Sequence, residues 1–278
     1  SEVLKGKARG IKSSVGPAVV QVPHGGMRSL GDYFENSPMC ASDDESTNSK
    51  AMTIGEVEGL IEDGIASAVR CKDAGFDGVQ LHGAHGYLIA QFLSPEINRR
   101  DDAYGGTPEK RAKVLYDIIE GINAFCGRSF SLGVRLSPER FGQRTEEIRD
   151  LAGQLLTDDR IDYVDMSLWD VFKPASDEAF AGESLLKVFT DLPRKGVALG
   201  AAGKLYSAND CQRAMDSGLD FVLVGRGAIV HADFPNLVME NPDFAMLDLP
   251  VSREHLADQG LGAKFIDYMA SWKGFVAA

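Results

Sequence analysis

The sequence is poor in cysteine and in basic charge, and both shortages restrict what the protein can be. Its four cysteines, Cys40, Cys71, Cys126 and Cys211, are each separated by more than about 30 residues, so no Cys-x-x-Cys motif of a metal, cluster or redox site is present. We expect reduced, mostly buried thiols. The chain has 29 Lys and Arg against 41 Asp and Glu, a formal net charge of −12 at pH 7. Such an acidic chain repels the phosphate backbone, so we expect no nucleic-acid partner.

Long apolar runs are also missing. No run approaches the roughly 20 residues that a membrane-spanning helix needs, and the chain does not open with the charged-then-apolar pattern of a signal peptide. We therefore expect a cytoplasmic protein with no membrane partner. Its hydrophobic fraction of 44% and charged fraction of 25% are ordinary for a globular domain with a sizeable core.

What the sequence does contain is an alternation of short β-branched runs with longer amphipathic stretches. We expect strands at Ala18–Val22, Gly78–Leu81, Ser131–Leu136, Tyr163–Ser167, Gly196–Leu199 and Asp220–Val224. We expect helices at Thr53–Ala74, which opens with a capping-box spacing, and at Pro108–Phe125, Thr145–Leu156 and Ser207–Ser217. This alternation predicts parallel strands joined by right-handed crossovers, and the nearly continuous apolar runs predict strands buried on both faces.

The fold class expected from this rhythm is α/β, a TIM (β/α)8 barrel, because strand–helix units of about 25–35 residues favour a barrel over a doubly wound sheet. Only six strands can be counted. The 17 residues before Ala18 cannot hold two further units of roughly 30 residues each. We therefore expect one domain over residues 1–278, truncated to about six βα units and lacking the first two. Residues 251–278 are expected to be a helical tail, with Leu261–Val276 packed on the barrel.

The densest group of chemically active side chains follows the strand expected at Gly78–Leu81. His82 and His85 leave this strand where barrel enzymes build their active sites, and Tyr87 comes two residues later. Two histidines can donate hydrogen bonds to one substrate oxygen, and a tyrosine hydroxyl can donate a proton nearby. An alternative is a metal-dependent lyase or hydrolase, in which His24 joins the two histidines as a third ligand.

Two segments rich in small residues, Gly200–Gly203 and Val224–Gly227, follow the last two expected strands. Small residues let backbone N–H groups approach a phosphate, and the loops after strands seven and eight are the usual phosphate site of this barrel. Arg226 adds a charge that can bind a phosphate through two hydrogen bonds. The sequence has neither a Walker loop nor a G-x-G-x-x-G motif, so a Rossmann dinucleotide site is not indicated.

One continuous block of sequence resembles the Old Yellow Enzyme family. It consists of GFDGVQLHGAHGYL at Gly75–Leu88, QFLSP at Gln91–Pro95 and NRRDDAYGG at Asn98–Gly106, within a resemblance that runs from about Val19 to Val230. The resemblance implies an FMN-dependent oxidoreductase on an FMN-binding TIM barrel. Such an enzyme reduces the activated C=C bond of α,β-unsaturated carbonyl compounds with NAD(P)H as hydride donor, in ping-pong fashion through the flavin. The partner is then a small-molecule enone, and a homo-oligomeric state is left open.

The resemblance also implies roles for individual residues. His82 and His85 would bind the carbonyl oxygen, where negative charge develops, and Tyr87 would protonate the carbon that receives no hydride. Arg135 would lie beside the pyrimidine edge of the flavin, and Gln21 would hydrogen-bond the ring. The remaining cofactor-binding residues expected on this basis are Ala201, Ala202, Gly203, Gly225 and Arg226.

Two features depart from the family pattern. The first two strands of the family have no counterpart, and Met27 stands where the family often places an arginine. An open six-stranded barrel exposes two unpaired strand edges, so we expect this chain to be part of a longer gene product. A barrel fragment that does not bind flavin and does no catalysis is therefore the second hypothesis.

Overall fold

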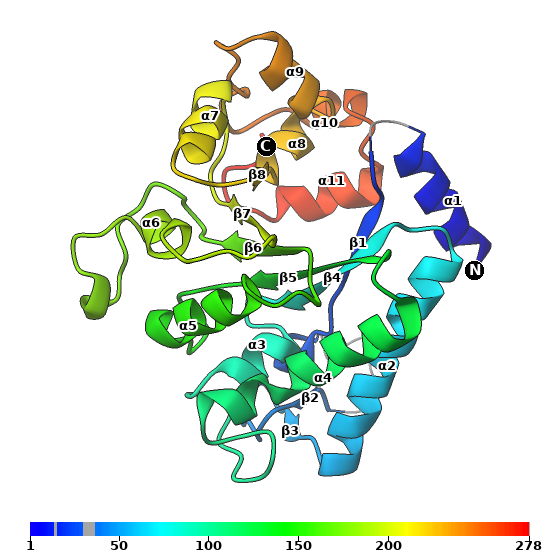
Figure 1. Ribbon diagram of the computed structural model, residues 1–278. Coiled ribbons are helices and arrows are strands. Elements are labelled where there is room, and N and C mark those ends of the chain that lie inside the picture. The colour runs from blue at the N-terminus through cyan, green and yellow to red at the C-terminus, as the bar shows by residue number, and fades with distance from the viewer. Residues whose placement is uncertain (14–15, 30–36, 278) are drawn as a thin grey trace.

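The computed structural model describes residues 1–13, 16–29 and 37–277, with one six-stranded sheet at its centre (Figure 1). The strands follow one another across the sheet in chain order: β1 (Val19–Val22), β4 (Gly78–Gly83), β5 (Ser131–Leu136), β6 (Tyr163–Ser167), β7 (Ala198–Ala202) and β8 (Phe221–Leu223). Every neighbouring pair is parallel. The six parallel strands expected from the sequence are confirmed. Because they run the same way, the residues that follow them meet at one edge of the sheet.

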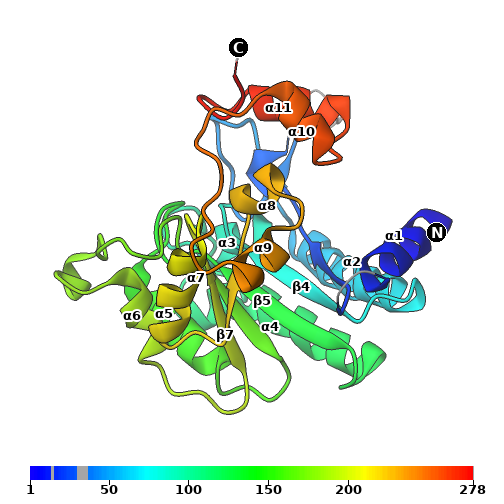
Figure 2. The ribbon, with the colours of Figure 1, turned by 90° about the horizontal axis from the view of Figure 1, so that it is seen from above.

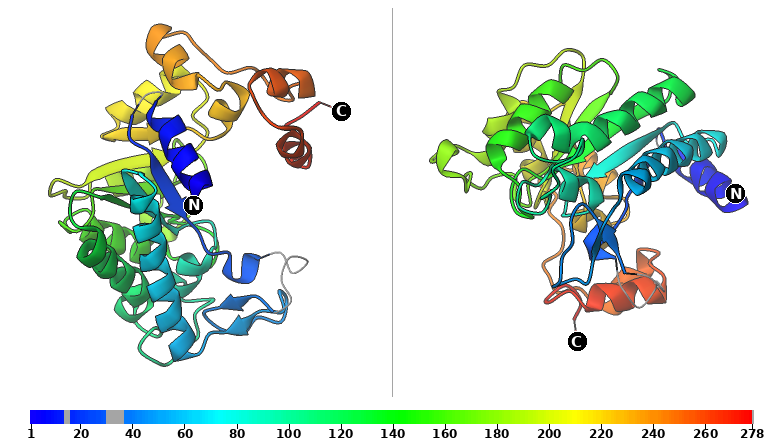
Figure 3. Two further views of the ribbon diagram at one scale, coloured as in Figure 1. Left: turned by 90° about the vertical axis from the view of Figure 1, so that its right-hand side faces the viewer. Right: turned by 90° about the horizontal axis from the view of Figure 1, so that it is seen from below.

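Helices cover the outer face of this curved sheet. The predicted helices are confirmed as α2 (Ile54–Asp73), α4 (Pro108–Cys126), α5 (Thr145–Leu155) and α7 (Ala208–Asp216). Figure 3 shows α2, α4 and α5 along one side of the sheet, opposite the side on which the C-terminal helices lie. The capping box of α2 is also present: Glu56 N–H donates to Thr53 Oγ1 at 3.3 Å, and Thr53 N–H donates to Glu56 Oε2 at 2.7 Å.

Side chains alternate between the two faces of each strand, and this alternation separates core from site. On β6, Val164 and Met166 are fully buried in the apolar core. Their neighbours Tyr163, Asp165 and Ser167 are on the opposite face. This opposite face is the inner face of the sheet. Here the ring of Tyr163 lies over Gly133 of the neighbouring strand β5, where an added Cβ would lie only 2.0 Å from the ring. The inner face therefore needs glycine opposite a large side chain.

The predicted bounds of two strands are wrong. The strand predicted at Gly78–Leu81 is β4 and extends to Gly83, so His82 lies within the strand and does not follow it. The sequence predicted a strand at Gly196–Leu199, whereas β7 runs over Ala198–Ala202. Gly196 has a φ of 81°, a left-handed turn that precedes the strand. The small residues expected to follow the strand are part of it, because Gly200 leaves room for the ring of Phe221, which an added Cβ would approach to 2.2 Å. Of the segment Gly200–Gly203, only Gly203 lies beyond the strand.

The C-terminal tail is helical only in part. The predicted helix Leu261–Val276 is reduced to α11 (Ala263–Ala270), which Gly262 caps, and it is preceded by α10 (Arg253–Asp258). Gly274 has a φ of 74°, which is incompatible with a continuing helix. The tail packs on α8 (Arg226–Val230) and forms a second apolar cluster apart from the main core (Figure 2). Residue 278 lies outside the described residues.

Several short elements were not predicted from the sequence. They are α1 (Glu2–Lys12), β2 (Met39–Cys40), β3 (Lys50–Ala51), α3 (Leu88–Leu93), α6 (Leu185–Thr190), α9 (Phe234–Glu240) and the 3-10 turns Gly26–Arg28 and Glu178–Phe180. α1 is joined to the sheet by Ala8, which is buried in the core, and by an ion pair of 2.7 Å between Lys12 and Asp77. Across the described residues, no helix combines the length and apolar character that crossing a bilayer requires.

Candidate active site at the carboxyl edge of the sheet

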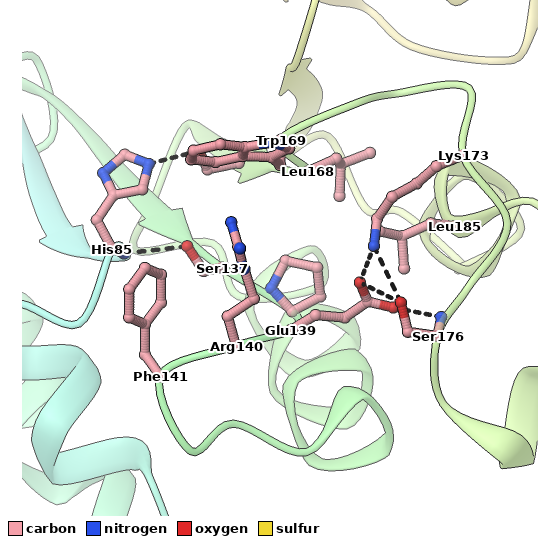
Figure 4. A pocket seen from close by; sticks show the side chains of 12 residues that line it. His85, Ser137, Glu139, Arg140, Phe141, Leu168, Trp169, Lys173, Ser176 and Leu185 are labelled. Carbon is pink, nitrogen blue, oxygen red and sulfur yellow. Dashed lines mark hydrogen bonds and ion pairs between the residues drawn. The ribbon is translucent and has the colours of Figure 1, made fainter. Parts of the chain in front are cut away.

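The residues that follow the strands line two adjoining cavities. Cavity 1 has a volume of about 370 Å³, and its lining includes Ser137, Glu139, Arg140, Phe141, Lys173 and Ser176 (Figure 4). Cavity 2 has a volume of about 290 Å³, and its lining includes Arg135, Ala202, Gly203, Tyr206, Gly225 and Arg226. His85, Ser167 and Trp169 line both cavities and therefore lie where the two meet.

The two histidines form a hydrogen-bonded chain at this junction. His82 is the second-last residue of β4, and its Nε2 lies 3.2 Å from His85 Nδ1. His85 Nε2 lies 2.7 Å from Ser167 Oγ. The backbone N–H of His85 donates to Ser137 Oγ at 3.0 Å. The serines that follow β5 and end β6 thus fix the orientation of an imidazole carried by the loop after β4.

Both imidazoles are neutral near pH 7. Burial, the repulsion that a protonated His85 would exert and the charge of Arg135 together lower the pKa of His82 to about 3. Burial also lowers the pKa of His85 to about 4, together with the charges of Arg135 and Arg28. A neutral imidazole carries one N–H donor, so each ring can donate one hydrogen bond without carrying charge. Within the described ranges, the buried His82 Nδ1 has no hydrogen-bond partner.

Tyr87 lies next to this pair. It precedes α3, and its ring centroid is 4.9 Å from that of His82. The Arg28 guanidinium lies 5.8 Å from the centre of the Tyr87 ring. The structure therefore brings together the three residues expected to be catalytic, but only His85 lines the cavities: His82 is buried behind it, and neither His82 nor Tyr87 is part of either lining.

A polar network on the inner face continues from this site into the sheet. Arg135 Nε lies 3.1 Å from Asp165 Oδ2, and Arg135 Nη2 donates to Ser167 Oγ at 3.3 Å. Gln80 Nε2 donates to the same Asp165 oxygen at 3.2 Å, and Gln21 Nε2 donates to Gln80 Oε1 at 2.6 Å. Strand register produces both pairs, because Arg135 is opposite Asp165 and Gln21 is opposite Gln80. Gln21 thus reaches the site only through Gln80.

Asp165 is a carboxyl group with no exposed surface. Burial raises its pKa to about 6, while the Arg135 charge and the Gln80 hydrogen bond oppose that rise. At neutral pH it is therefore ionised and paired with Arg135. In the part of the chain that the structure describes, Asp165 Oδ1 has no hydrogen-bond partner, whereas Oδ2 forms the ion pair with Arg135 Nε.

The residues expected to bind a phosphate divide between cavity and core. Ala202, Gly203, Gly225 and Arg226 line cavity 2. Ala201 does not, because it is fully buried on the outer face of β7 among the core residues. A Cβ added to Gly225 would meet no atom within 4 Å, so there is open space beside the backbone at this position.

The third imidazole of the metal hypothesis is elsewhere. His24 lines a separate cavity that includes Leu60 and Asp63 of α2, on the helix-covered side of the sheet. Its Nδ1 accepts a hydrogen bond of 3.1 Å from Gly26 N–H. Over residues 1–13, 16–29 and 37–277, no three His, Cys, Asp or Glu side chains are placed to hold a metal ion. His24 therefore cannot complete a site with His82 and His85 in this structure.

Sequence reasoning missed several residues of the site, including Gln80, Ser137 and Arg140, and three others show why. Asp165 had a visible signal, since a carboxylate in the middle of the buried run Tyr163–Ser167 needs a partner. Ser167 ends a strand just as Arg135 nearly does, which also places it at this edge. Trp169 gave no signal, because its position between the cavities depends on a left-handed backbone with a φ of 64°.

Comparisons with known proteins agree with this geometry. Residues 5–242 match the sequence model of the NADH:flavin oxidoreductase / NADH oxidase family. The chain is 32% identical over 248 residues to "Probable NADH-dependent flavin oxidoreductase YqiG" of Bacillus subtilis, covering 85% of this chain and 66% of that protein. It is 30% identical over 240 residues to an NADPH dehydrogenase of Bacillus pumilus, covering 84% of this chain and 68% of that protein. It spans only 31% of the NADH oxidase of Thermoanaerobacter brockii, to which it is 32% identical over 207 residues and 70% of this chain.

The fold also matches solved structures. Morphinone reductase superposes with a TM-score of 0.73 at 26% identity, covering 91% of this chain and 72% of that chain. A structure of morphinone reductase in complex with tetrahydroNAD matches with a TM-score of 0.72 at 25% identity, covering 91% of this chain and 72% of that one. These neighbours are TIM barrels of the Old Yellow Enzyme type, so the six-stranded sheet corresponds to part of such a barrel. The resemblance to the Old Yellow Enzyme family is confirmed, and the chain belongs to the NADH:flavin oxidoreductase / NADH oxidase family.

Proposed function

We propose that the protein binds FMN and uses NAD(P)H to reduce the activated C=C bond of an α,β-unsaturated carbonyl compound, in ping-pong fashion. The observation that carries this proposal is the neutral imidazole of His85 at the junction of the two cavities, bonded to Ser167 and backed by the buried, neutral imidazole of His82 at 3.2 Å. The names of the relatives support it, since they include NADH- and NADPH-dependent flavin enzymes.

The residues present fit an FMN group. In cavity 2 no other part of the chain covers the backbone at Gly225, so a phosphate could approach it closely. Arg226, whose Nη1 donates to Tyr206 Oη at 3.1 Å, would give that phosphate a charged partner. Arg135 also lines this cavity, and its guanidinium, which Asp165 and Ser167 hold in place, would be the cation beside the pyrimidine edge of the ring. When bound, FMN would supply the hydride-transfer chemistry between the nicotinamide and the substrate carbon.

The side chains of this chain would handle charge and protons. In place of their hydrogen bonds to each other and to Ser167, His82 and His85 would donate to the carbonyl oxygen, on which negative charge grows as the β-carbon gains hydride. Because both rings resist protonation, they would stabilise this charge as neutral donors rather than transfer a proton to it. Tyr87 would then supply the proton to the α-carbon. Its ring lies beside His82 and near the Arg28 guanidinium.

The test is to purify the protein, add FMN, and measure the dissociation constant from flavin fluorescence and the enone-dependent oxidation of NAD(P)H. We expect saturable binding and turnover. The substitution Arg226→Met should weaken FMN binding by roughly tenfold or more, as expected for a lost charge-assisted hydrogen bond. Arg9→Met, on the exposed face of α1, is the matched control. A folded protein that binds no FMN would support the alternative of a non-catalytic barrel fragment.

A further inference from the structure

The charges in cavity 1 do not cancel. Its lining contains Glu139, Arg140 and Lys173, and the last two are cations. Lys173 donates to Glu139, whose carboxylate also accepts a hydrogen bond of 2.7 Å from the Ser176 backbone N–H. Glu139 and Lys173 therefore neutralise each other. Arg140 has no carboxylate within ion-pair distance among the described residues, in a chain whose net charge is −12.

Arg140 is held in place by an aromatic ring rather than by a counter-ion. Its guanidinium carbon lies 4.6 Å from the centre of the Trp169 ring. Figure 4 shows Arg140 rising into cavity 1 toward Trp169, with Phe141 and His85 beside it. A guanidinium over a ring keeps its N–H groups available at the edge, where they can bind a carboxylate.

The backbone that presents Arg140 is strained and clamped. Arg140, Phe141 and Gly142 have φ values of 70°, 55° and 70°, so two non-glycine residues in succession adopt the left-handed conformation. Ser94 Oγ donates to the Gly142 carbonyl at 2.7 Å, which ties this turn to the segment after α3. Such strain persists where the surrounding structure imposes it, and it is concentrated at binding sites.

We propose that Arg140 forms a subsite for an anionic group of the substrate, so that the preferred substrates are α,β-unsaturated carbonyl compounds that carry a carboxylate. The inference rests on the proposed function and specifies its substrate class. Arg226 in cavity 2 is committed to the cofactor phosphate under that proposal, whereas Arg140 shares cavity 1 with His85, which would hold the carbonyl oxygen. A ligand that reaches both must have a carbonyl at one end and an anion at the other.

The experiment compares 4-oxo-2-pentenoate with its methyl ester, which keeps the enone and removes the charge. In the FMN-loaded protein, the acid should have a kcat/KM at least about tenfold above that of the ester. Arg140→Met should remove this preference by lowering only the value for the acid. The preference should also shrink with added salt, because the subsite is open to solvent. Arg144→Met, an exposed cation close by in the chain, should leave the preference unchanged.

Two further measurements keep the outcomes apart. Tryptophan fluorescence titrations give the dissociation constants of acid and ester without turnover, so a protein that binds the acid through Arg140 but reduces neither compound would retain the subsite and refute the proposed function. Equal loss for acid and ester in Arg140→Met would overturn the subsite. A raised KM for NAD(P)H, with the acid preference intact, would assign Arg140 to a coenzyme phosphate and overturn the substrate assignment.

Discussion

The pair formed by Arg135 and Asp165 leads to a strong prediction about stability. Arg135→Met removes the cation and keeps much of the apolar volume of the side chain. Asp165 would then be a fully buried carboxyl group with only the Gln80 amide as a donor. Removing one partner of a buried ion pair destabilises a protein by about 3–5 kcal/mol. For a domain of this size that corresponds to a fall in Tm on the order of 10 °C.

The pH dependence of this effect has a defined sign. Burial already raises the pKa of Asp165 to about 6, above its ordinary value of 3.8, so this group lowers stability as the pH rises from about 4 to 6. Without Arg135 the pKa rises further. The loss then continues above pH 6, because the folded variant must keep a proton that the unfolded chain releases. For each pH unit between pH 6 and the new pKa, the unfolding equilibrium constant of the variant rises by up to about tenfold.

The assay is urea unfolding of wild type, Arg135→Met and the double variant Arg135→Met/Asp165→Asn, at about pH 5 and about pH 8. We expect the single variant to be more destabilised at the higher pH. The double variant should recover most of the loss there, because it carries no buried charge. An equal loss at both pH values, together with no recovery in the double variant, would refute the ion-pair reasoning.

Two other predictions concern the histidine–tyrosine group. Tyr87→Phe should slow reoxidation of the reduced flavin by an enone by roughly 10²-fold or more, the scale of a lost general acid, as followed by stopped-flow absorbance. Reduction of the flavin by NAD(P)H should stay near the wild-type rate. Equal losses in both half-reactions would contradict a proton-donor role. Because the pKa values of His82 and His85 are lowered to about 3 and about 4, the stability that these neutral rings provide should be complete above pH 6.5 and fall toward pH 4. Urea midpoints measured across this range should show a shallower fall in His82→Gln, and an identical fall would contradict burial as the cause.

The local patterns of the sequence determined most of the secondary structure. Uninterrupted apolar runs predicted the six parallel strands, and the capping residues Thr53 and Thr107 stand at the starts of α2 and α4. Parallel topology then placed His82, Arg135 and Ser167 at one edge, since all strands end there. The boundary of β7 was not predictable in this way, because Gly200 looks like a loop residue until the ring of Phe221 is seen to need its space.

Pairings between distant residues were decided by the tertiary structure alone. The sequence contains Arg135 and Asp165, but only strand register sets them opposite each other, and register depends on how every strand packs. The orientation of β7 likewise decided which of its side chains face the core, so that Ala201 is buried and Ala202 lines cavity 2. The low pKa values of the histidines follow from burial, which is a property of the assembled fold. Sequence therefore determined which chemical groups reach this edge of the sheet. Packing decided their partners and their charge, and it left Arg140 without a counter-ion among the residues that the structure describes.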